Sequence, residues 1–161
     1  MKIGVIGIGM LGEAIVLNLL NLGQDVAVYN RTKEKTMRVE NNGAKVMDSP
    51  KAVAENTELV IIVVKDAIAV REVSFGEKGI VESKNKKPII ADMSTIDAEE
   101  SKRIADEFQR NDIKKIEIPV MGGPNVAITG KLVMMASGPK TSFDYCKPIF
   151  EKIANKILFL G

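Results

Sequence analysis

The sequence contains no histidine and no tryptophan, and its 161 residues include one cysteine, Cys146. Without histidine the chain cannot build a Ser-His-Asp triad, a Cys-His pair or a histidine-ligated zinc site, and we predict no metal site. Any acid–base chemistry must therefore use Lys, Asp, Glu, Tyr or a cofactor. A single cysteine also excludes a disulfide within the chain.

The chain also lacks an excess of either charge and a long apolar run. Lys and Arg number 23 and Asp and Glu 21, a net charge of +2 that favours neither nucleic acid nor a membrane surface as a partner. No apolar stretch approaches the ~20 residues of a membrane span. The N-terminal segment has the apolar character of a signal peptide, but Glu13 interrupts it and no A-x-A cleavage site follows. We therefore expect a cytoplasmic protein.

Short β-branched runs alternate with segments of helical periodicity. Strands are predicted at Lys2–Ile6, Asp25–Tyr29, Ala44–Met47, Leu59–Val64, Pro88–Asp92, Lys115–Pro119, Lys131–Ala136 and Lys156–Leu160. Helices are predicted at Met10–Leu22, Lys33–Asn41, Pro50–Glu55, Ala67–Val73, Asp97–Arg110 and Lys140–Ala154. Runs such as LVIIVV are typical of strands buried on both faces. The alternation predicts an α/β fold: a doubly wound, Rossmann-type, mostly parallel sheet with helices on both faces, in a single domain of residues 1–161.

The stretch GIGMLG, residues 7–12, forms a G-x-G-x-x-G pattern between the first predicted strand and the first predicted helix. This context favours a dinucleotide-binding loop over a glycine-rich turn with no ligand. In such a loop Gly7 permits the tight turn, Gly9 lets the backbone approach a pyrophosphate, and Gly12 allows close packing of helix and strand. The residues predicted to hold the pyrophosphate are Gly7, Ile8, Gly9, Met10, Leu11 and Gly12.

The second predicted strand ends in VYNRT, where NAD sites usually carry Asp or Glu about 20 residues beyond the glycines. This chain has Asn30, which would not repel a 2′-phosphate as a carboxylate would. Arg31 can form charge-assisted hydrogen bonds with that phosphate, and the hydroxyl of Thr32 can donate a hydrogen bond to it. The alternative is a solvated turn with an incidental arginine. The turn therefore favours NADP, with NAD bound more weakly.

Three ordered segments resemble the β-hydroxyacid dehydrogenases, a family that includes 3-hydroxyisobutyrate dehydrogenase, tartronate semialdehyde reductase and 6-phosphogluconate dehydrogenase. The segments are GVIGIGMLGEAIVLNLLNLGQDVAVYNRT, ADMSTID and IPVMGGPNVAITGKLVMMASG. The resemblance covers nearly the whole chain. It implies NADP-dependent hydride transfer between the nicotinamide and a small 3-hydroxy acid or semialdehyde.

The resemblance also implies roles for residues beyond the glycine loop. Val64 and Lys65 would border the nicotinamide, and Thr95 would contact it. The implied contacts of the substrate carboxylate are Ser94, Gly122 and Gly123. Met121 stands where the family usually has serine, so the resemblance does not imply the substrate hydrogen bond of that serine here.

The family carries its catalytic lysine on a helix after the last Rossmann strand, followed by an all-helical domain. This chain stops at Gly161, before any such segment, so we assign no catalytic residue and expect residues 1–161 to be inactive alone. Two alternatives are a free-standing module that binds or senses NADP without turnover, and an imine or ketone reductase with another proton donor. We also expect self-association through apolar surface around Val120, Met121, Ile157 and Phe159.

Overall fold

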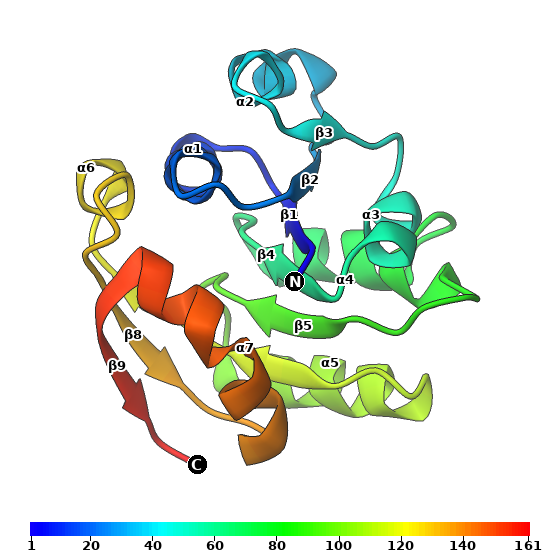
Figure 1. The fold of residues 1–161 in the computed structure, drawn as a ribbon. Helices are drawn as coiled ribbons and strands as arrows, with labels where there is room; N and C mark the ends of the chain where they lie inside the picture. Colours follow the sequence, from blue (N-terminus) through cyan, green and yellow to red (C-terminus); the bar gives the residue numbers. More distant parts are fainter.

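The main sheet of the structure, a computed structural model that describes residues 1–161, consists of six parallel strands (Figure 1). The strands are β1 (Ile3–Ile6), β2 (Val26–Tyr29), β3 (Lys45–Val46), β4 (Leu59–Ile62), β5 (Ile89–Asp92) and β6 (Lys115–Glu117). Their order is β3-β2-β1-β4-β5-β6, so the direction of winding reverses between β1 and β4. This order confirms the predicted Rossmann-type fold.

Helices cover both faces of this sheet. They are α1 (Met10–Asn21), α2 (Met37–Asn41), α3 (Pro50–Asn56), α4 (Ala67–Phe75), α5 (Ala98–Arg110), α6 (Pro124–Ala127) and α7 (Lys140–Ile153), with 3-10 turns η1 (Lys33–Thr36) and η2 (Ile80–Glu82). No helix combines the length and the apolar composition that a membrane span requires.

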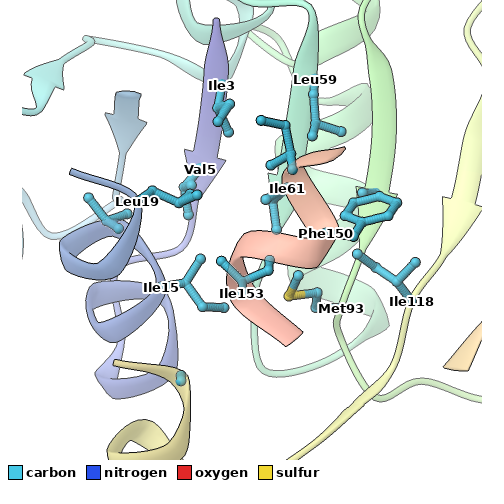
Figure 2. Close-up of a cluster of buried hydrophobic side chains, with 14 of the residues drawn as sticks. Ile3, Val5, Ile15, Leu19, Leu59, Ile61, Met93, Ile118, Phe150 and Ile153 are labelled. Carbon is cyan, nitrogen blue, oxygen red and sulfur yellow. The ribbon is translucent and has the colours of Figure 1, made fainter. Parts of the chain in front are cut away.

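Alternation along the strands divides the core into two clusters, one on each face of the sheet. Ile61 of β4 belongs to the cluster that α1 and α7 cover, and Figure 2 shows Phe150 and Ile153 of α7 in it. The next residue, Ile62, belongs to the cluster that α3, α4 and α5 cover. The continuous apolar strands follow from this burial on both sides.

The last strands do not extend the main sheet, contrary to the single doubly wound sheet expected from the sequence. β7 (Val120–Met121), β8 (Leu132–Ala136) and β9 (Ala154–Phe159) form a second sheet beside α7, with β7 antiparallel and β9 parallel to β8 (Figure 1). Only an isolated bridge joins it to β6, where Glu117 and Ser137 exchange two backbone hydrogen bonds of 2.9 Å. The N–H of Met135 donates a 3.1 Å bond to the carbonyl of Pro119, and β7 then pairs with β8 in the same register as this bridge, so the chain after β6 passes into the second sheet.

The apolar surface differs from the one expected. Ile157 and Phe159 of β9 are half-buried and pack against the core, and Leu158 between them is 41% exposed. Successive side chains of a strand point to opposite faces, so the expectation chose the wrong face of β9. Met121, at 57% exposure, does lie at the surface, while Val120 is half-buried.

Cys146 is buried on the core side of α7, and burial raises the pKa of its thiol to about 12. Because the thiolate is the reactive form, we expect labelling by a disulfide reagent at mildly alkaline pH to be roughly 10³-fold slower than for a free cysteine. The reaction should reach one thiol per chain after unfolding in guanidinium, which serves as the control. Rapid labelling of the folded chain would contradict the burial.

Candidate functional site

A cavity of about 590 Å³ opens where β1, β2 and β4 end. Its volume lies within the ~300–1,000 Å³ of small-molecule sites, and its position is the switch point at which doubly wound sheets bind their ligands. Of the residues predicted for the cofactor, its lining includes Gly7, Gly9, Asn30, Arg31, Thr32, Val64 and Lys65. The structure thus brings together three segments that lie far apart in the sequence.

The structure explains the three glycines of the loop in different ways. Gly7 has φ +102°, and a Cβ there would lie 2.0 Å from the carbonyl oxygen of Val63. A Cβ on Gly12 would lie 1.9 Å from the carbonyl oxygen of Gly7. At Gly9, by contrast, a Cβ would meet no atom within 4 Å. Gly7 and Gly12 therefore serve the fold, while Gly9 faces open space at the wall of the cavity.

The other residues of the predicted loop lie outside the cavity lining. Ile8 is buried and belongs to the core, whereas Met10 is 79% exposed. Leu11 is half-buried and packs against the core. For these three residues, a contact with the pyrophosphate through the backbone stays a prediction.

The N-terminus of α1 has no side-chain cap. Its N-cap residue is Gly9, whereas Ser49, Asp66 and Asp97 cap α3, α4 and α5 by accepting backbone N–H bonds. The first N–H groups of a helix have no partner within the helix, and with the helix dipole they favour an anion. The uncapped end of α1 at the cavity therefore suits the binding of a phosphate group.

Asn30 links the glycine loop to the turn after β2. Its Oδ1 accepts a 2.9 Å bond from the N–H of Ile8, and its Nδ2 donates a 2.8 Å bond to the carbonyl of Thr32. An asparagine suits both bonds because its amide carries an acceptor and a donor. The side chain therefore holds the two loops in place. Its predicted contact with the ribose stays a prediction.

The part of the cavity beside Asn30, Arg31 and Thr32 carries more charged residues than the sequence analysis identified. Arg31 is 75% exposed and lies 3.8 Å from a carboxylate oxygen of Glu72, an exposed pair of the kind that contributes little. Lys35 and Lys78 also line the cavity. Lys35 follows the NRT turn, residues 30–32, so closely that the sequence alone could have indicated it as a cavity residue. Glu72 and Lys78 come from α4 and the segment after it, which only the folded sheet brings to β2.

The residues predicted for the substrate, Ser94, Gly122 and Gly123, do not line this cavity, and neither does Thr95, which is predicted to contact the nicotinamide. Ser94 lies in the segment after β5, where its Oγ accepts a 3.1 Å bond from the N–H of Val64. Thr95 lies next to it in the chain. Gly122 has φ +126°, and Gly123 precedes α6. The roles of these four residues stay predictions.

Comparison with known proteins adds the family context. The family model described as the NAD binding domain of 6-phosphogluconate dehydrogenase matches residues 2–161. The uncharacterized oxidoreductase YfjR of Bacillus subtilis is 34% identical over 100% of this chain and 56% of its own length. Glyoxylate/succinic semialdehyde reductase 1 of Arabidopsis thaliana is 33% identical over 100% and 56%.

A solved structure, Psf3 in complex with NADP+ and 2-OPP, has a TM-score of 0.93 and 26% identity, covering 98% of this chain and 56% of that one. The chain spans about half the length of the curated relatives that it matches.

Proposed function

Because this chain belongs to the family of the NAD binding domain of 6-phosphogluconate dehydrogenase, we propose that it is the cofactor domain of an NADP-dependent β-hydroxyacid dehydrogenase. The observation that carries the proposal is the uncapped start of α1 at Gly9, which faces open space at the cavity. The proposed substrate is a small 3-hydroxy acid or its semialdehyde. The name of the Arabidopsis relative, a semialdehyde reductase, supports that class.

Each part of the cavity has a proposed task. The N–H groups at the start of α1 bind the pyrophosphate, and Arg31, Thr32 and Lys35 bind the phosphorylated ribose. Val64 and Lys65 border the nicotinamide, which supplies the hydride when the cofactor is bound. The chain's own contribution is therefore binding and orientation.

The alternative is a module that binds or senses NADP without turnover, and it would use the same cavity. Steady-state assay of the natural protein with NADPH and small semialdehydes separates the two functions. Oxidation of NADPH in proportion to protein supports the dehydrogenase. Tight NADP binding without turnover supports the module.

The preference for NADP over NAD tests the proposed cofactor site directly. Arg31→Ala should weaken NADP binding by about 10–100-fold, because a charge-assisted bond contributes ~1.5–3 kcal/mol and the site is exposed. NAD lacks the 2′-phosphate, so its affinity should change less than about twofold on the same scale. Calorimetric titration of both cofactors at fixed salt measures the difference.

The matched control is Arg38→Ala, an exposed arginine that pairs with Glu13 and does not line the cavity. It should leave both affinities unchanged. Equal wild-type affinities for NADP and NAD, or an equal loss of both in Arg31→Ala, would show that the NRT turn does not read the phosphate.

A further inference from the structure

A lysine is buried in the edge strand of the main sheet. The side chain of Lys115 in β6 is 1% exposed, although most lysines lie at the surface. Its Nζ donates a 2.8 Å bond to Ser101 Oγ of α5, and it lies 3.6 Å from carboxylate oxygens of both Asp92 and Glu117. Ser101 in turn donates to Glu117. One ammonium group therefore lies between two carboxylates beneath α5.

The strand register explains this cluster. Asp92 of β5 is paired with Glu117 of β6, and Ile90 is paired with Lys115. Alternate residues of a strand share a face, so all three charged side chains point to the face that α5 covers. Asp92 is only 2% exposed, and burial raises its pKa while Lys115 lowers it. The lysine is thus the cation that favours an ionised Asp92.

Asp92 connects this cluster to the cavity. Its Oδ1 accepts a 2.9 Å bond from the backbone N–H of Ser94, while its Oδ2 has no hydrogen-bond partner. Ser94 Oγ accepts the N–H of Val64, and Val64 lines the cavity. A continuous path therefore runs from Lys115 through Asp92 and Ser94 to the cavity wall after β4.

A gain in stability is a weak explanation for this buried lysine. Burying an ion pair costs desolvation energy, and replacing such a pair by apolar side chains is often neutral or stabilising. We propose that Lys115 is a positioning residue, which holds Asp92 against Ser94 and so fixes the segments after β4 and β5 that border the nicotinamide. The proposal rests on the proposed NADP site, and its test includes a readout without cofactor.

The first measurement compares two ligands on the Lys115→Met variant. NADP+ should bind about tenfold more weakly than to wild type, the equivalent of losing one hydrogen bond to a charged group. Adenosine 2′,5′-bisphosphate lacks the nicotinamide, so its affinity should stay within about twofold of wild type. Equal loss of both ligands, or no loss of either, would overturn the proposal.

Two further variants sharpen the comparison. Lys115→Met combined with Asp92→Asn should recover most of the NADP+ affinity, because an amide oxygen accepts the Ser94 N–H without needing a cation. The matched control is Lys114→Met, an exposed lysine next in the chain, which should change neither affinity. If Lys115→Met does not fold, Lys115→Gln removes the charge while keeping a donor for Ser101. The affinities of this variant for NADP+ and adenosine 2′,5′-bisphosphate then test the proposal in the same way.

The second measurement needs no ligand. Amide hydrogen exchange followed by NMR should be faster at Ser94 and Val64 in Lys115→Met, with Ile6 and Ile61 unchanged. A lysine that only stabilises the fold would speed exchange at all four amides alike, and this outcome would overturn the proposal. If wild type binds neither ligand, the NADP proposal fails, while the exchange rates still test the positioning.

Discussion

Gly12→Ala should lower the free energy of unfolding by about 3 kcal/mol or more, at the upper end of what overpacking costs. The new Cβ would lie 1.9 Å from the carbonyl oxygen of Gly7, a backbone atom that cannot rotate away. Alanine favours helices over glycine by ~1 kcal/mol, so helix propensity alone predicts the opposite sign. The sign of the change therefore separates the two effects.

Urea unfolding followed by circular dichroism measures this change. Gly9→Ala is the matched control, because it adds the same methyl group to the same loop where no atom lies within 4 Å. An unfolding midpoint of Gly12→Ala equal to or above wild type would show that α1 and β1 do not pack as closely as described.

Gly9→Ala should keep its stability and lose the cofactor. Its φ of −84° is open to alanine, so we expect the free energy of unfolding to stay within about 0.5 kcal/mol of wild type. The methyl group would occupy space that the pyrophosphate needs. Losing one or two charge-assisted bonds at ~1.5–3 kcal/mol each corresponds to a loss of roughly 100-fold in affinity.

The loss should be shared by NADP and NAD, because both carry the pyrophosphate. Arg31→Ala should affect NADP alone, so the two variants give different patterns in the same titration. Unchanged affinity of Gly9→Ala for both cofactors would place the pyrophosphate elsewhere and would remove the main support for the proposed function.

The sequence predicted best where the determinants are local. The glycine loop, its strand and its helix occupy consecutive residues, and the distinct roles of Gly7 and Gly12 follow from backbone geometry. The second sheet was missed for two reasons. β7 is only two residues long, and the sequence of a β-strand does not indicate which sheet the strand joins. The face of β9 was assigned wrongly for a similar reason, since its burial depends on what α7 covers.

Asn30 shows where the chemistry of a site depends on distant contacts. The sequence indicated the absence of a carboxylate, but not that the amide bonds the N–H of Ile8, 22 residues away. An aspartate there would lose the donor to the Thr32 carbonyl and would place a negative charge against it. The proposed preference for NADP therefore depends on the shape of the turn as well as on the charge of Arg31. Lys115 could not be identified either, because its partners come from β5 and α5.

The contribution of α7 to the core sets a condition on folding during synthesis. Phe150 and Ile153 complete the cluster that α1 began, and Asn18 donates a 2.9 Å bond to the carbonyl of Lys152, 134 residues later. Contacts of such long separation form slowly because the intervening chain must first be closed into a loop. A nascent chain that already contains the whole glycine loop therefore still exposes one apolar face of its sheet. The core cluster between the main sheet and α7 can therefore close only after α7 has left the ribosome.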